Sequence, residues 1–241
     1  MIIDCHFHIG DGENMGSKSQ INCTVALAEK QLDRAGVDRA IIFPVSYNDY
    51  LQPNTEIAEI AAANKRFIGF ARLDADSPTG GAQLEHAIKE LGLKGLKIMN
   101  VPTRGMMDKA RELKIPVLIH SGFTRPPMVY EGVARSYPDV TIILAHLGFT
   151  ANRDNLFSFP LQANYLARKY KNVYLDTSAA TWTQYTLKLA LEEVGVDKIL
   201  FGSDGPWFLP SIMLACLRDL ELPERDMRKI LYENIAGILK L

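Results

Sequence analysis

Short apolar runs alternate with longer amphipathic stretches along the whole 241-residue chain. The apolar runs are rich in β-branched and aromatic residues, which is typical of strands that are buried on both faces of a parallel sheet. The stretches between them are rich in Ala, Leu, Glu and Lys and have helical periodicity. We place strands at residues 2–6, 39–45, 67–73, 93–99, 116–120, 140–146, 172–177 and 198–203, and helices at segments that include 54–64, 81–91, 106–113 and 182–194.

The number of strand–helix units favours one particular α/β architecture. Eight units in 241 residues match a closed (β/α)8 barrel, or TIM barrel, better than an open doubly wound sheet. The Gly-x-Gly-x-x-Gly phosphate loop of a dinucleotide-binding sheet is absent after the first strand. The longest predicted loops, 9–23 and 147–157, follow strands one and six, and no linker divides the chain. We therefore predict a single domain over residues 1–241.

The composition limits the kinds of partner and the cell compartment that we expect for this protein. The net charge is −1 and no run of Lys or Arg appears, so a small-molecule substrate is expected rather than a nucleic acid. No segment reaches the roughly 20 apolar residues that span a bilayer, and the start lacks the pattern of a secretory signal. An odd number of scattered cysteines, three in all, fits a reducing cytoplasm. The sequence predicts a cytoplasmic enzyme and leaves open a homo-oligomer.

Four of the five histidines lie at the ends of predicted strands. His6 and His8 are separated by one residue, so in a strand both imidazoles share a face. His120, His146 and Asp204 each follow a later apolar run. Because the carboxyl ends of all strands open on the same face of a barrel, we expect these side chains to converge there. Nitrogen and carboxylate donors suit Zn²⁺ or another borderline divalent ion, and scattered ligands indicate an open, catalytic site.

Several motifs carry a resemblance to a known family. They are Ile3-Asp4-Cys5-His6-Phe7-His8, Gly92 to Lys97, Ile119-His120-Ser121-Gly122, Ala145-His146-Leu147-Gly148, Phe201 to Trp207 and Tyr232 to Ala236. In this order they resemble the amidohydrolase superfamily, and specifically the amidohydrolase-related branch that includes aminocarboxymuconate semialdehyde decarboxylase-like proteins. The resemblance implies a metal-dependent (β/α)8 barrel with a mononuclear site at the C-terminal face. Members hydrolyse C–N, C–O or P–O bonds or, in this branch, decarboxylate aromatic or unsaturated acids.

The resemblance also implies roles for individual residues. His6, His8, His120 and Asp204 would surround one metal ion, and His146 would be a fourth imidazole or lie just outside the ligands. Asp204 and His146 would be the catalytic groups that move a proton, which agrees with the acid–base chemistry expected beside a metal-activated water. We expect Asp4 to share the face of His6 and to hydrogen-bond a ligand.

Four further residues are candidates for binding substrate. Lys97, which by position could be a carbamylated bridge between two metals, is better interpreted as a charge near the barrel mouth that pairs with a carboxylate or an anionic substrate group. Arg125 and Arg153 lie in loops after strands five and six and could bind a carboxylate or phosphate. Trp207 could form a pocket wall or pack within its loop. Asp176, at the end of strand seven, lies on the same face of the barrel as these residues. A role in the site and a role as a structural hydrogen-bond partner are equally plausible for it.

The motifs leave the reaction open, and the main expectation is hydrolysis. In this hypothesis water activated by Zn²⁺, with Mn²⁺ as the alternative, attacks an ester, lactone or amide-like bond. The alternative hypothesis is a lyase that removes CO₂ from an aromatic or unsaturated acid at the same site. A TatD-type nuclease is disfavoured by the absence of basic patches and by the Gly-Ser-Asp form of the last motif. A barrel that has lost catalysis is disfavoured because no ligand is missing.

Overall fold

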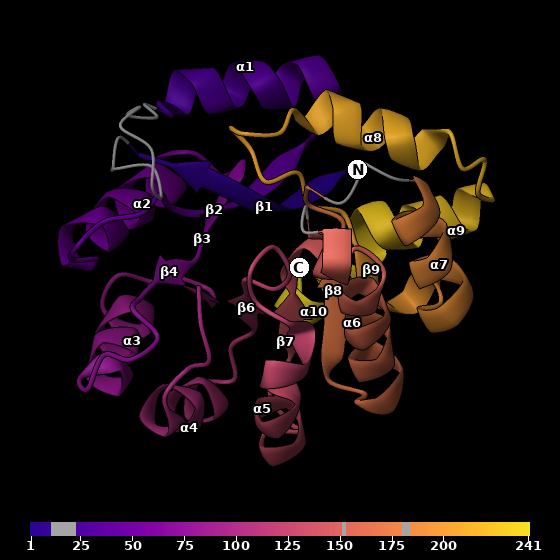
Figure 1. The fold of residues 1–241 in the computed structure, drawn as a ribbon. Coiled ribbons are helices and arrows are strands. Elements are labelled where there is room, and N and C mark those ends of the chain that lie inside the picture. The colour runs from indigo at the N-terminus through magenta and orange to yellow at the C-terminus, as the bar shows by residue number, and fades with distance from the viewer. Residues whose placement is uncertain (11–22, 151–152, 180–183) are drawn as a thin grey trace.

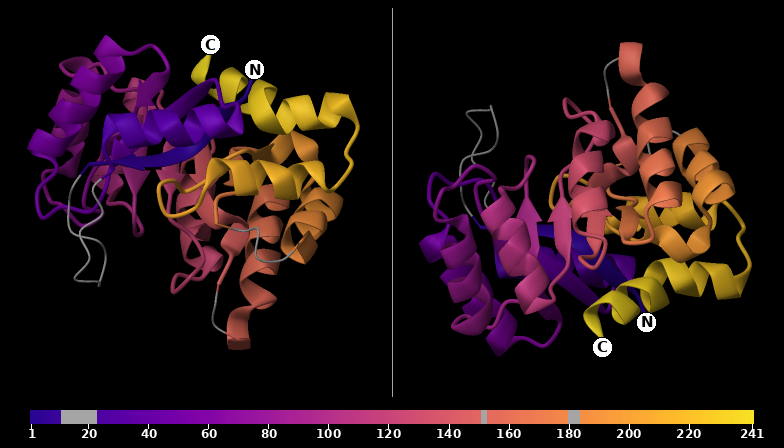
Figure 2. Two further views of the ribbon diagram at one scale, coloured as in Figure 1. Left: turned by 90° about the horizontal axis from the view of Figure 1, so that it is seen from above. Right: turned by 90° about the horizontal axis from the view of Figure 1, so that it is seen from below.

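A computed structural model describes residues 1–10, 23–150, 153–179 and 184–241. The strands lie at the centre and the helices surround them (Figures 1 and 2). The strands are β1 (Ile3–Ile9), β2 (Arg39–Pro44), β3 (Phe67–Gly69), β4 (Ala71–Arg72), β5 (Leu96–Ile98), β6 (Val117–Ile119), β7 (Ile142–Leu144), β8 (Val173–Asp176) and β9 (Ile199–Leu200). The α-helices are α1 (Val25–Ala35), α2 (Leu51–Ala63), α3 (Gly80–Lys89), α4 (Arg104–Leu113), α5 (Glu131–Ser136), α6 (Ser158–Lys169), α7 (Gln184–Val194), α8 (Pro210–Arg218), α9 (Glu224–Arg228) and α10 (Asn234–Leu239).

The strands form a closed parallel ring. Ladder pairing runs through β1-β2-β3 and through β4 to β9, always between parallel neighbours. β3 and β4 are two halves of one barrel strand, which is interrupted at Phe70; the Phe70 amide still donates to Ile42 O at 2.9 Å. On the far side the Cys5 amide donates to Phe201 O at 2.9 Å, which joins β1 to the segment after β9. The predicted (β/α)8 barrel is therefore confirmed.

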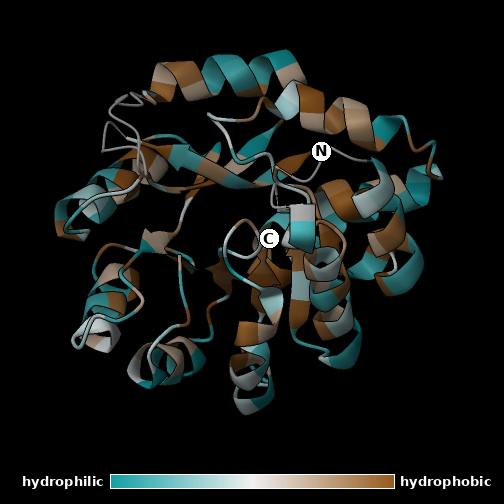
Figure 3. Cartoon of the chain, viewed as in Figure 1, coloured by the Kyte–Doolittle hydropathy of each residue, from teal (hydrophilic) through white to brown (hydrophobic). Residues whose placement is uncertain are grey.

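Two apolar clusters fill the two sides of this ring. The larger one lies between the strands and the surrounding helices, whose inward faces supply residues such as Leu32, Leu84 and Leu166. The smaller one lies inside the ring and consists of residues from several strands, such as Ile41 and Ile143. In Figure 3 the helices carry both hydrophobic and hydrophilic residues along their lengths, while most strands at the centre are mainly hydrophobic. The pattern of apolar positions along the chain thus corresponds to a core with an inner and an outer layer.

Local signals set the helix boundaries. Thr24 begins α1 with its hydroxyl accepting the Leu27 amide at 3.2 Å, and Thr103 caps α4 in the same way. Gly36 ends α1 in the left-handed conformation, with φ of +69°, and its amide donates to Leu32 O and Asp33 O. Most observed strands are shorter than the predicted apolar runs, because ladder pairing stops where the chain turns into buried loops. Within the described part of the chain, no helix is long and apolar enough to cross a membrane.

The first strand contains an irregularity that matters for the site. The pairing register of β1 with β2 shifts between Asp4 and Phe7, as in a β-bulge. Cys5 packs in the inner cluster, yet the next residue, His6, also reaches the functional end of the barrel. A bulge changes which side chains share a face, so simple alternation along this strand fails.

Candidate metal and active site

The strand-end histidines and Asp204 meet at one end of the barrel. One oxygen of the Asp204 carboxylate, Oδ1, lies 3.2 Å from His6 Nε2 and 3.3 Å from His8 Nε2. His146 Nε2 lies 3.1 Å from His120 Nδ1, and the ring centroids of His6 and His146 are 5.0 Å apart. The convergence that the sequence predicted for these five residues is observed.

Two of these residues occupy a strained backbone conformation. His146 has φ of +68° and Asp204 has φ of +67°, in the left-handed region that side chains other than glycine rarely adopt. The Asp204 amide donates to His6 O at 2.9 Å, and this bond fixes the segment after β9 against β1. Such conformations persist where the surrounding structure enforces them, and they gather at functional sites.

Asp176, at the end of β8, links two of the imidazoles. Its Oδ2 accepts a hydrogen bond from Nδ1 of His6 at 2.9 Å, and its Oδ1 accepts the amide N–H of His146 at 2.9 Å. The same Oδ1 accepts the amide of Ser178 at 3.0 Å. From the sequence, a functional and a structural role were equally plausible for Asp176. The signal that could have identified its role is a carboxylate that ends an otherwise apolar strand on the active face.

The rings of His146 and His8 are also held through one nitrogen. His146 Nδ1 lies 3.1 Å from Ser178 O, and His8 Nδ1 lies 3.4 Å from Pro44 O. The His8 ring contacts Phe43 and Trp207 edge to face, with centroids 4.6 and 4.5 Å away. In each case Nε2 faces the cluster, which is the arrangement that backbone or carboxylate partners impose on metal-binding histidines.

Burial controls the protonation of these groups. It lowers the pKa of His8 to about 3 and that of His146 to about 4, and it holds the pKa of His120 well below the ordinary value. Burial and Lys97 oppose protonation of His6, but the carboxylates of Asp176 and Asp204 raise its pKa overall. Three of the imidazoles are therefore neutral at neutral pH, which is the form that binds a metal ion.

The donor atoms fit a divalent cation. Among the described residues, ligand atoms of His6, His146 and Asp204 all lie within 4.8 Å of one another. When Nδ1 of a neutral His6 donates a hydrogen bond to Asp176, its Nε2 and the facing Asp204 Oδ1 are both acceptors, so a proton or a cation between them would stabilise the pair. Imidazole nitrogen and carboxylate oxygen together suit Zn²⁺ or Mn²⁺.

Lys97 lies deeper than the sequence suggested. It is fully buried inside the ring, with Nζ 3.2 Å from His6 Nε2 and 5.3 Å from the centroid of Phe43. No carboxylate of the described residues lies within ion-pair distance, and burial lowers its pKa to about 7. The side chain lies deeper than the barrel mouth because the β5 register points it into the barrel interior. The described residues supply no carboxylate partner, and pairing with an anionic substrate group stays a prediction.

Asp4 agrees with its prediction in part: it hydrogen-bonds the candidate ligand His6, but through the backbone amide and not through the ring. Its Oδ1 accepts the backbone amides of His6 at 3.0 Å and Ser203 at 2.9 Å, and it contacts no imidazole. Its Oδ2 is buried without a partner, and burial raises the pKa of this carboxyl to about 6. The register shift in β1 is the physical reason, since Asp4 and His6 no longer share a face.

A cavity of about 470 Å³ opens over the cluster. His8, His120, His146 and Asp204 line it together with Ser46, Arg72, Met99, Phe123, Thr124, Arg125, Trp207 and Phe208. Arg125 and Trp207 therefore lie where a substrate could touch them, whereas Arg72 and Phe123 were missed from the sequence. The side chain of Arg153 lies outside the described part of the chain.

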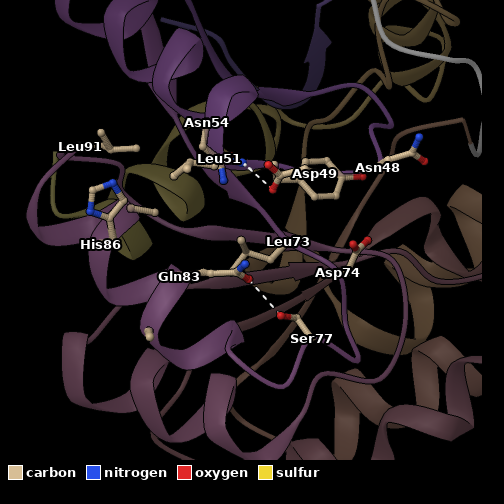
Figure 4. Close-up of a pocket in the computed structure, with 13 residues that line it drawn as sticks. Asn48, Asp49, Leu51, Asn54, Leu73, Asp74, Ser77, Gln83, His86 and Leu91 are labelled. Atoms are coloured by element: carbon tan, nitrogen blue, oxygen red, sulfur yellow. Dashed lines mark hydrogen bonds between the residues drawn. The ribbon is translucent and has the colours of Figure 1, made fainter.

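A second hollow, of about 420 Å³, lies elsewhere, between α2 and α3 (Figure 4). His86, Gln83 and Asp49 are among its lining residues, and none of the clustered ligands belongs to it. His86 is exposed on α3, in agreement with its exclusion from the predicted site.

Two curated proteins that are similar in sequence to this chain are named decarboxylases. It is 25% identical over 250 residues to the γ-resorcylate decarboxylase of Polaromonas sp., covering 80% of this chain and 75% of that protein. It is 22% identical to the decarboxylase orsB of Emericella nidulans, covering 77% and 73%. A crystal structure of a dihydroxybenzoic acid decarboxylase from Polaromonas sp., with bound manganese and the inhibitor 2-nitroresorcinol, superposes with a TM-score of 0.76 at 20% identity and covers 100% of this chain and 97% of that one.

These relatives correct the expected reaction. Hydrolysis was the main expectation and decarboxylation the alternative, but the two curated relatives described above are named as decarboxylases. The expectation of a hydrolase is wrong, and the sequence motifs could not reveal this because the resemblance assigns both reactions the same metal ligands.

The family itself follows from the extent of the match. The amidohydrolase family model matches residues 3–241, which include every strand of the barrel and all five clustered side chains. The chain belongs to the amidohydrolase family of enzymes.

Proposed function

We propose that this protein is a metal-dependent decarboxylase of a single-ring aromatic hydroxy acid. The observation that carries the proposal is the convergence of His6, His8, His120 and Asp204 under a small cavity with aromatic walls, in a chain whose curated relatives are decarboxylases. A cavity of about 470 Å³ suits one aromatic ring with its substituents.

His6, His8, His120 and Asp204 would hold one divalent cation. The manganese in the Polaromonas structure makes Mn²⁺ the first choice, and the nitrogen-rich donor set keeps Zn²⁺ as the second. His146 is the alternative fourth imidazole, because its donor atom belongs to the set that lies within 4.8 Å. When bound, the cation supplies positive charge that polarises oxygens of the acid.

The chain's own residues must deliver one proton to the ring carbon. Decarboxylation breaks the bond between the ring carbon and the carboxylate, CO₂ leaves, and the electron pair that stays on the ring carbon takes up a proton. Asp204 and His146 would be the groups that take up a proton from water and pass it to the ring carbon, because both line the cavity and both belong to the hydrogen-bonded cluster.

The cavity walls would bind and orient the ring. Phe123, Trp207 and Phe208 offer aromatic surfaces that exclude water and favour a planar substrate. Nε of Arg125 donates a hydrogen bond to Asn100 Oδ1, which leaves its other guanidinium donors for an anionic oxygen at the cavity mouth.

Product analysis tests the proposal. Mn²⁺-loaded protein is incubated with hydroxybenzoates, including 2,6-dihydroxybenzoate, in water enriched in ¹⁸O. We expect release of CO₂ and formation of the phenol without ¹⁸O in the aromatic product. His120→Ala should abolish the reaction, while the control His86→Ala, at an exposed histidine of α3, should retain it. Absence of CO₂ from every acid in the panel would refute the proposal.

A further inference from the structure

Arg72 is a buried cation that the cluster described above does not account for. It is the last residue of β4, only 2% of its surface is exposed, and it pairs in register with Lys97 on β5. Among the described residues no carboxylate lies within 4.0 Å of its guanidinium. Because burying an unpaired charge is costly, such a group is expected to have a function.

The backbone of Arg72 is fixed by a side chain from α2. The buried Asn54 donates from Nδ2 to Arg72 O at 3.0 Å and accepts the Arg72 amide on Oδ1 at 2.9 Å. The pair of bonds reproduces what a neighbouring strand would supply at the break between β3 and β4. The arginine therefore stands on a rigid support.

Two bonds orient the guanidinium toward the cavity. Nη1 donates to Pro44 O at 2.9 Å and Nη2 donates to Ser46 Oγ at 2.9 Å. The same Pro44 carbonyl lies 3.4 Å from His8 Nδ1, so the arginine adjoins a candidate ligand. A guanidinium has five N–H donors, and no group among the described residues accepts a hydrogen bond from the buried Nε of Arg72.

We propose that Arg72 binds an anionic oxygen, carboxylate or phenolate, of the substrate beside His8. The inference deepens the proposed function and rests on it. Arg72 lines the same cavity as His8 and Asp204, and an anionic oxygen there would pair with its charge and accept from its unused donors. This residue would select acids over their neutral analogues.

Binding measured without turnover tests the assignment. Isothermal titration of the Mn²⁺-loaded protein, at a temperature low enough that no CO₂ is released during the titration, compares each hydroxybenzoate of a panel with its amide, for example 2,6-dihydroxybenzoate with 2,6-dihydroxybenzamide. We expect the wild type to prefer the acid and Arg72→Gln to lose roughly 10- to 100-fold in affinity for it, with little change for the amide. Resorcinol titrated near the pKa of its hydroxyls reports whether the phenolate, rather than the carboxylate, depends on Arg72.

A matched control separates this role from a structural one. Arg66 also donates to a backbone carbonyl and has a buried Nε without a partner, but it lies at the start of β3 on the opposite end of the barrel. Arg66→Gln should leave the acid-to-amide ratio unchanged. Should Arg72→Gln lose manganese or unfold, Arg72→Lys, which keeps the charge but not the planar fork of donors, is titrated in its place.

The outcomes decide between the two proposals. If the wild type shows no preference for the acids, or if the Arg72 variants keep that preference, the inference is overturned. If the preference depends on Arg72 but no acid releases CO₂, the decarboxylase proposal fails while the binding role of Arg72 stands.

Discussion

The Asp176 carboxylate lies 2.9 Å from Nδ1 of His6, and its other oxygen holds the backbone of His146. One buried carboxylate therefore orients an imidazole from β1 and positions the turn that carries a second imidazole. Although burial opposes ionisation, the adjacent His6 lowers the pKa of Asp176, so it remains an anion. An ionised partner of this kind makes an imidazole a better metal ligand.

We predict that Asp176→Asn weakens metal binding by roughly 10- to 100-fold, because the neutral amide no longer holds His6 in its orientation. Competition with a fluorescent chelator measures the dissociation constant for Mn²⁺. Asp139→Asn, at an exposed carboxylate that pairs with Arg111, is the control and should bind normally. Equal affinities for both variants would contradict the orienting role.

Removal of the metal should destabilise the fold. A cation that binds only the folded chain stabilises it by about 2.7 kcal/mol at a hundredfold excess over its dissociation constant. Chelation should therefore lower the Tm and abolish activity, and added Mn²⁺ should restore both. A Tm that does not respond to chelation would argue against a site formed by His6, His8 and Asp204.

Asp4 should leave a signature in the pH dependence of stability. Its pKa rises from 3.8 to about 6 on folding, chiefly through burial, so the folded chain binds the proton more tightly. The stabilisation from this group is complete below pH 3.8 and is lost as the pH rises through 6. Relative to Asp4→Asn, the metal-free wild type should gain up to about 3 kcal/mol between pH 8 and pH 4. Urea unfolding at a series of pH values measures this difference, and parallel curves would contradict it.

Trp207 should contribute to binding rather than to chemistry. Its ring meets His8 edge to face at 4.5 Å and lines the cavity. Trp207→Ala should raise KM about tenfold and change kcat little, since the aromatic wall contacts the bound ring in the ground state and the transition state alike. Steady-state kinetics test this, with Phe157→Ala as the control because Phe157 is 61% exposed. A fall in kcat at constant KM would show a different role.

The sequence predicted the barrel and the meeting of its strand-end ligands because both follow from chain-wide regularities. The carboxyl ends of parallel strands share one face, so His120, His146 and Asp204 could be grouped without coordinates. The facing of Asp4 and the depth of Lys97 could not be predicted because both depend on local register, and a single bulge in β1 breaks the alternation. Arg72 was missed because one charge at the end of an apolar run carries no periodic signal.

The left-handed backbone at His146 and Asp204 bears on how this family could diverge. Glycine would relax each of these positions by about 1 kcal/mol, yet it would delete a side chain of the cluster. A lineage freed from selection for catalysis could therefore drift toward glycine there and relieve backbone strain as its enzymatic activity disappeared.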